Sequence, residues 1–176
     1  MRVRREFGWG VALMLALSVS GCTIRREHGT FAGPAAQTRS VVFDSAATSR
    51  FLWALSHCSE LPIDSIGGTW TPSDNDIRLL EARLFVALRA SLDRTSLRAQ
   101  DYYFQYFGVL DQAKRIVLIN GFHDAVRRAG LDDPEDWRQE PVVVCDAGMG
   151  EFQAAYDVES RQLRELHFFP RFNGPP

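Results

Sequence analysis

The chain has 176 residues, of which 20 are basic and 22 are acidic, so its formal net charge at pH 7 is −2. A slightly acidic protein has no general electrostatic attraction for nucleic acid or for an anionic lipid surface, which argues against both as charge-driven partners. Hydrophobic residues make up 45% of the chain, a proportion typical of globular proteins.

The first twenty-two residues have the order of an export signal. Arg2, Arg4 and Arg5 precede an apolar run at residues 11–19, and the small residues Ser20 and Gly21 follow it. A transmembrane helix needs about 20 apolar residues, so this run is too short to span a bilayer. The segment is therefore interpreted as a cleavable leader.

The end of this leader, Val19-Ser20-Gly21-Cys22, resembles a bacterial lipobox. The resemblance implies cleavage before Cys22, removal of residues 1–21 as a lipoprotein signal peptide, and acylation of Cys22. Two or three acyl chains hold a protein on a membrane essentially permanently. Thr23 resembles the residue found in lipoproteins that pass to the outer membrane, so we expect an anchored protein facing the periplasm, at the outer membrane. Arg4-Arg5 leaves twin-arginine export open beside the general route.

The remaining 155 residues are enough for one domain with a core of its own, and they carry a net charge of −4. Residues 22–40 are polar and rich in small side chains, which predicts a lipidated tether. Residues 41–176 are then expected to form a single domain.

Two helices are predicted at the start of that domain. The first covers residues 43–57. The second follows a start signal in which Ser73 and Asp76 are spaced as a capping pair. Its apolar residues recur every three or four positions and form one stripe for packing on a sheet: Ile77, Leu80, Leu84 and Leu88.

The second half of the chain is dominated by strand patterns. A polar turn at residues 111–114 joins the first two predicted strands, and a short helix is expected to begin at His123 and to end near Gly130. The five predicted strands are residues 102–110, 115–122, 141–145, 152–158 and 162–168. The predicted fold is α+β, with one or two N-terminal helices packed on a roughly five-stranded antiparallel meander.

Several of these segments together resemble a group of small uncharacterised lipoproteins of Gram-negative bacteria. The resemblance spans about residues 70–174 and departs at Ala147, where the familiar pattern has a glycine. It implies location and fold, and it implies no activity. The matching residues are Trp70-Thr71-Pro72, Leu80-Glu81, Gln105-Tyr106, Gly108, Asn120, Phe122, Trp137, the run from Pro141 to Asp146, Phe152, Tyr156-Asp157, Leu166 and Phe172-Asn173-Gly174.

Two cysteines remain once Cys22 is acylated. In an oxidising periplasm, Cys58 and Cys145 either form a disulfide or stay as two separate buried thiols, and both alternatives remain open. A cysteine nucleophile needs exposure and a lowered pKa. Cys145 lies in an apolar run and Cys58 near a helix end, so neither position favours one.

The segment between Asp146 and Glu151 is the most suggestive candidate site. Its glycines, Gly148 and Gly150, and its flanking carboxylates fit a weak ligand loop or an acid–base pair. They also fit the turn of a hairpin connection, in which glycine supplies positive φ and aspartate bonds the backbone. The turn is the favoured interpretation.

The sequence therefore predicts a non-enzymatic binding or interaction module of the cell envelope, with an envelope protein as partner. The alternatives are a small envelope hydrolase using Asp146, Glu151 or a cysteine, and an inhibitor of a wall-degrading enzyme. No catalytic residue, metal site or cofactor is predicted, because no motif with metal-ligand or nucleotide-loop spacing occurs.

Overall fold

The computed structural model describes residues 39–57, 65–130, 136–144 and 146–169. The chain divides into two units, residues 1–31 and 32–176, and every element described below belongs to the second. Three helices lie between strands along the described chain: α1 (Ser45–His57), α2 (Asp74–Leu92) and α3 (Asp124–Gly130). The six strands are β1 (Ser40–Phe43), β2 (Ile66–Trp70), β3 (Tyr102–Asp111), β4 (Lys114–His123), β5 (Glu151–Asp157) and β6 (Gln162–Phe168).

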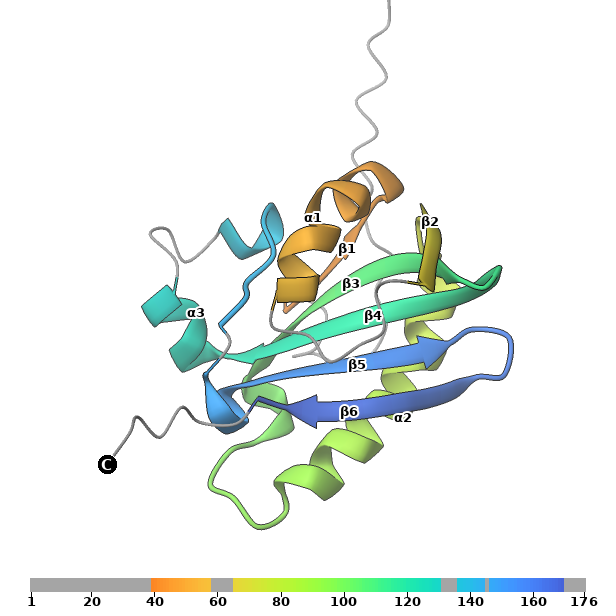
Figure 1. Cartoon of the computed structure of the whole chain (residues 1–176). Coiled ribbons are helices and arrows are strands. Elements are labelled where there is room, and N and C mark those ends of the chain that lie inside the picture. Colours follow the sequence, from red (N-terminus) through yellow and green to blue (C-terminus); the bar gives the residue numbers. More distant parts are fainter. Residues whose placement is uncertain (1–38, 58–64, 131–135, 145, 170–176) are drawn as a thin grey trace, which may run out of the picture. The chain divides into compact units, whose positions relative to one another are not determined.

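The strands form one mixed sheet in the order β1-β3-β4-β5-β6 (Figure 1). β1 runs parallel to β3, and the other pairs are antiparallel. Both β1 and β2 pair with the edge of β3 that faces away from β4. β1 pairs with residues 104–107 and β2 with residues 108–111, so the two short strands follow one another along that edge.

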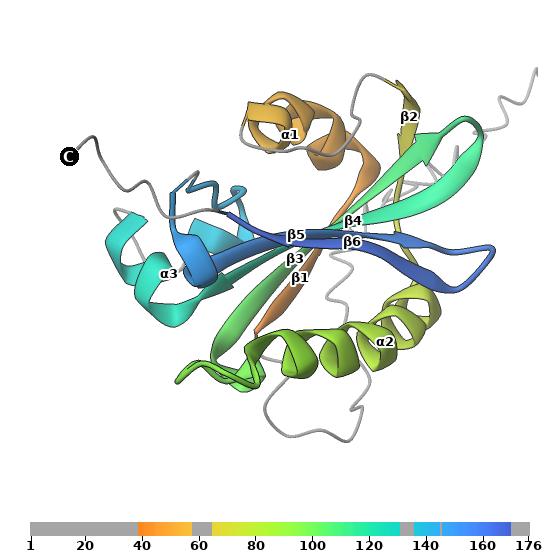
Figure 2. The same cartoon turned by 60° about the horizontal axis from the view of Figure 1, so that its bottom comes forward.

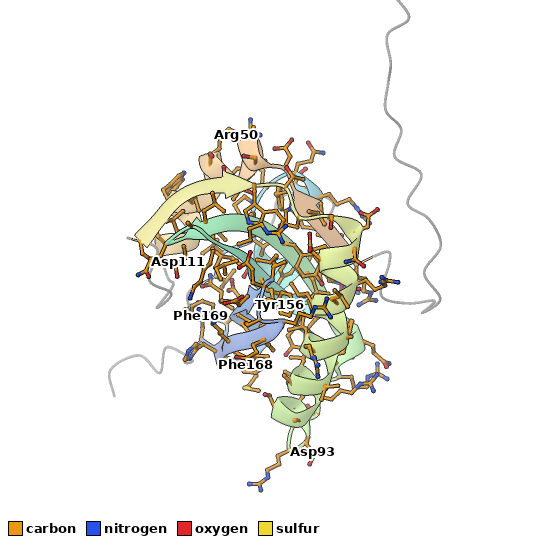
Figure 3. The ribbon with its side chains drawn as sticks, turned by 90° about the vertical axis from the view of Figure 1, so that its right-hand side faces the viewer. Arg50, Asp93, Asp111, Tyr156, Phe168 and Phe169 are labelled. Atoms are coloured by element: carbon orange, nitrogen blue, oxygen red, sulfur yellow. The ribbon has the colours of Figure 1, made fainter. Side chains whose placement is uncertain are left out.

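Helices cover both faces of the sheet, with α1 on one face and α2 on the other (Figure 2). The larger core lies on the α2 face, where the leucine stripe of α2 packs against aromatic residues of β3 and β5. Tyr156 of β5 is one of these residues and lies between the sheet and α2 (Figure 3). The smaller core joins α1 to the opposite face through Phe43, Leu55 and Phe107.

Helix α2 forms where its cap and its apolar stripe predict it. The Ser73 side chain accepts a hydrogen bond from the backbone N–H of Asp76, and the Asp76 carboxylate accepts one from the backbone N–H of Ser73. This reciprocal pair satisfies two donors that the first turn of a helix leaves unbonded. The buried residues are the predicted stripe extended by one more turn: Ile77, Leu80, Leu84, Leu88 and Leu92.

The hairpin of β3 and β4 is also confirmed, with a tight turn at Gln112 and Ala113. Both turn residues have positive φ, 47° and 66°. Two such residues give the turn the twist that neighbouring antiparallel strands require. The short helix expected to end near Gly130 is confirmed as α3.

The α+β class is confirmed, but the predicted arrangement of elements is wrong. The sheet is mixed instead of wholly antiparallel, because β1 runs parallel to β3. β1 and β2 were not predicted: β1 has four residues, and β2 contains Gly67 and Gly68, which resemble a loop. Because these strands flank α1, helices and strands alternate instead of forming two blocks. The strand predicted at residues 141–145 is absent at residues 141–144, and residue 145 lies outside the described residues.

Candidate functional site

A row of amide side chains crosses the face of the sheet that α1 covers. Gln105 of β3 is the register partner of Asn120 on β4, and Asn120 is the partner of Gln153 on β5. Residues paired directly across strands project from the same face. Gln105 also shares its face with Phe107, two positions along β3, which packs in the α1 core. We call Gln105, Asn120 and Gln153 the amide row; all three are at least 96% buried.

Residues 137–144, which we call the strap, lie over this row. Gln105 Nε2 donates to the backbone oxygens of Trp137 at 2.6 Å and Glu140 at 2.7 Å, and its Oε1 accepts from Val142 N–H at 2.9 Å. Asn120 Nδ2 donates to Val142 O and, at 3.1 Å, to Gln105 Oε1. Side chains of the sheet therefore bind the backbone of the strap.

This arrangement explains why an apolar run at residues 141–144 does not become a strand. Buried backbone groups must have hydrogen-bond partners, and a strand finds them in a neighbouring strand. Here amides from β3 and β4 provide the partners instead. Local sequence carries no information about that choice, because Gln105 and Val142 are 37 positions apart.

Trp137 anchors the strap in a small aromatic cluster. Its side chain is fully buried and lies 5.0 Å from the Tyr103 ring and 6.2 Å from the Phe122 ring, measured between ring centroids. The guanidinium groups of Arg39 and Arg127 lie 4.8 and 4.9 Å from the Tyr103 ring centroid. Cations at this distance from an aromatic ring are attracted by its quadrupole, so the cluster has a charged margin.

Glu151, the first residue of β5, holds the other end of the strap. Its Oε2 accepts a hydrogen bond from Val144 N–H at 2.8 Å, and the residue is fully buried. Burial raises the pKa of the Glu151 carboxyl to about 8; the bond from Val144 opposes this shift, and the nearby charge of Asp146 adds to it. The carboxyl is therefore mostly neutral at pH 7.

Four buried polar side-chain atoms of the amide row, Glu151 and the strap have no hydrogen-bond partner among the described residues. They are Asn120 Oδ1, Gln153 Nε2, Glu151 Oε1 and Trp137 Nε1. Asn120 and Gln153 are paired across β4 and β5, and Glu151 lies two residues before Gln153 on the same face. Buried polar groups without partners are uncommon in folded proteins and mark places where a water or a ligand fits.

An open hollow of about 560 Å³ lies beside the strap, between it and the start of α1. Apolar side chains and charged ones both line it, including Phe51 and Arg50 from α1. Arg50 lies on the outer side of α1, away from the sheet (Figure 3). Residues 138–140 of the strap also line the hollow, and the backbone oxygen of Glu140 is bound by Gln105 of the amide row.

The segment from Asp146 to Glu151 forms a turn, as predicted, but it is not a hairpin connection, because residues 141–144 before it are not a strand. Gly148 begins a 3-10 turn, η4 (Gly148–Gly150), and has φ 59°, a conformation that favours glycine. Asp146 is exposed, whereas Glu151 is sealed under the strap. The structure thus brings the two carboxyls near one another but leaves only Asp146 open to solvent.

The remaining predicted site residues are the three cysteines. Cys22, Cys58 and Cys145 lie outside the described residues, so acylation and the disulfide remain predictions. Among the residues that the structure describes, no three His, Cys, Asp or Glu side chains are grouped as metal ligands would be. No helix within the described ranges is long and apolar enough to cross a membrane.

Sequence reasoning did not identify the amide row as a site. Gln105 and Asn120 each interrupt an otherwise apolar or aromatic strand, and this is the signal that could have found them, because a buried strand rarely carries an amide without a partner. Comparison with protein-family models, with curated proteins and with solved structures gives no match for this chain.

Proposed function

We propose that this protein is a lipid-anchored module of the cell envelope that binds an envelope protein without performing chemistry on it. The observation that carries the binding role is the open hollow beside the strap, where apolar and charged side chains are presented together. Such mixtures of apolar and polar lining residues are typical of binding sites. The buried carboxyl of Glu151, in contrast, has no access to solvent.

The leader supports the location. A basic start, a short apolar run and Ser20-Gly21-Cys22 are the parts of a lipoprotein signal. In this proposal Cys22 carries the acyl chains, residues 22–40 form a tether, and the folded domain faces the periplasm from the outer membrane. The tether allows the domain to reach partners a few nanometres from the bilayer.

Anchoring is tested by changing Cys22→Ala in the full chain. We expect loss of labelling by a fatty-acid analogue and movement of the protein to the soluble fraction. Ser20→Ala is a matched control that retains a small residue and the acylated cysteine. Continued membrane association of the Cys22 variant would refute the lipid anchor.

Binding at the hollow is tested by photocrosslinking in intact cells. A photoreactive amino acid replaces Gln139, an exposed residue on the strap side of the hollow, and in a control chain it replaces Arg89 on the exposed side of α2. We expect a discrete protein adduct from position 139 and none from position 89. Equal adducts at the two positions, or none at position 139, would refute the hollow as a binding site.

A further inference from the structure

The strap makes an unusual set of contacts with the sheet. Five of its backbone groups are bound by three side chains of the sheet, and none of these bonds involves a strap side chain. The groups are the C=O of Trp137 and of Glu140, the N–H and C=O of Val142, and the N–H of Val144. The hydrogen bonds between the sheet and the strap therefore use groups that every peptide shares, while the buried Trp137 and Val142 side chains add contacts specific to this sequence.

A primary amide suits this role because it presents a donor and an acceptor, as a peptide group does. Gln105 uses both: its Nε2 binds two carbonyls and its Oε1 binds Val142 N–H. Asn120 binds the C=O of the same valine. The two amides together hold both polar groups of one residue, much as a neighbouring strand would.

The amide row ends on β5 at Gln153, two residues from Glu151, which binds the end of the strap. Asn120 Oδ1 is an acceptor and Gln153 Nε2 is a donor, and both are buried without a partner among the described residues. They lie on paired residues of adjacent strands and on one face. The N–H and C=O of a peptide would satisfy both atoms, and a hydrogen bond from Gln153 Nε2 to Asn120 Oδ1 would satisfy them equally.

The hollow gives a peptide a way in. Val41 lines the hollow, and Gln105 is its register partner across β1 and β3. Residues 138–140 of the strap form one wall. Displacing the strap would thus join the hollow to the amide row.

We propose that the amide row is a binding site for the backbone of an extended peptide, and that the strap occupies it as an intramolecular ligand. This inference rests on the proposed function, because it names the partner chemistry of the same region: an extended segment of an envelope protein that displaces the strap. The backbone hydrogen bonds can form with any segment, whereas the places now filled by Trp137 and Val142 favour a segment with an aromatic and an aliphatic residue at those positions.

The test adds the strap as a separate peptide to the full chain in detergent. The probe is a fluorescein-labelled peptide with the sequence of residues 137–144, and its binding is followed by anisotropy. Trp137→Ala removes the buried anchor of the internal strap and leaves the amide row intact. We expect at least tenfold tighter binding to this variant than to the unmodified chain, because the peptide supplies the missing indole.

Trp53→Ala is the matched control, since Trp53 is 72% exposed on α1 and lies outside the strap. Its affinity for the peptide should equal that of the unmodified chain. If Trp137→Ala does not fold, Val142→Ala serves in its place, with the exposed Val86→Ala as its control. Equal affinity of the strap variant and its control would overturn the proposal.

Backbone recognition is checked with two further changes. A peptide N-methylated at the position of Val142 lacks the N–H that Gln105 Oε1 accepts, and Gln105→Met in the Trp137→Ala chain removes the amide at similar volume. Each change should reduce peptide affinity at least tenfold. If neither change alters the peptide affinity, the amide row is not a peptide-binding site, even if crosslinking at position 139 succeeds. If the peptide binds as expected but no crosslinked partner is found, only the proposed function is refuted.

Discussion

Glu151→Gln should remove a strong pH dependence from the stability of this protein. Burial raises the pKa of this carboxyl from an ordinary value of 4.5 to about 8 in the folded chain. Below pH 4.5 the Glu151 carboxyl is neutral in both the folded and the unfolded chain, so its burial does not lower the free energy of unfolding. Between pH 4.5 and 8 the unfolded chain loses the proton and the folded chain keeps it, so stability falls as pH rises through this window.

The size of the effect follows from the shift. One pKa unit corresponds to 1.36 kcal/mol. The raised pKa of Glu151 should therefore lower the free energy of unfolding by about 3–5 kcal/mol as the pH rises from 4.5 to 8. Above pH 8 both states are ionised and the loss is complete. Glutamine keeps an oxygen that can accept the hydrogen bond from Val144 N–H, and it cannot ionise. The free energy of unfolding of the variant, relative to the unmodified chain, should therefore increase by about that amount as the pH rises from 5 to 8.5.

The assay is urea unfolding followed by tryptophan fluorescence at pH 5, 7 and 8.5, with the difference between the two chains taken at each pH. Glu159→Gln, at an exposed residue beside Arg115, controls for the chemical change itself. Asp146→Asn should weaken the dependence of the free energy of unfolding on pH, because the charge of Asp146 contributes to the raised pKa of Glu151. A stability difference for Glu151→Gln that stays constant from pH 5 to 8.5 would refute the reasoning.

Three further predictions concern packing and the hairpin turn, and urea unfolding measures all of them. Leu84→Ala should lower the free energy of unfolding by about 2–5 kcal/mol, because Leu84 is fully buried under the sheet, whereas Val86→Ala on the exposed side of the same helix should change it by less than about 0.5 kcal/mol. Similar losses at the two positions would contradict the packing of α2. Gly121→Ala should cost about 1–3 kcal/mol, because a Cβ there would collide with the Phe152 ring, and an unchanged midpoint would show that the ring moves freely. Ala113→Gly should stabilise the protein by about 0.5–1 kcal/mol, because φ is 66° at this position; a loss would mean that the turn differs from the one described.

Elements defined by local signals could be predicted from the sequence. α2 was predicted because Ser73 and Asp76 lie three residues apart and the leucine stripe follows at helical spacing. The hairpin was predicted because two strand patterns flank a short polar turn. In both cases the residues that form the signal are close together in the chain, and their interactions hold in any globular context.

Elements defined by distant partners could not be predicted. β1 has only four residues, and it is a strand because β3, more than sixty positions away, pairs with it. The strap has a strand-like composition at residues 141–144, but its backbone is bound by amides from β3 and β4. Short apolar runs carry no information about which partner will satisfy their backbone groups.

The candidate site divides in the same way. By itself, the sequence determined the glycine turn after Asp146, because positive φ at Gly148 is a local requirement. Only the tertiary structure decided that Glu151 is sealed and carries a raised pKa, and that Gln105, Asn120 and Gln153 form one row. The reason is that burial and cross-strand pairing depend on residues far apart in the chain, whereas turns and helix caps depend on neighbours.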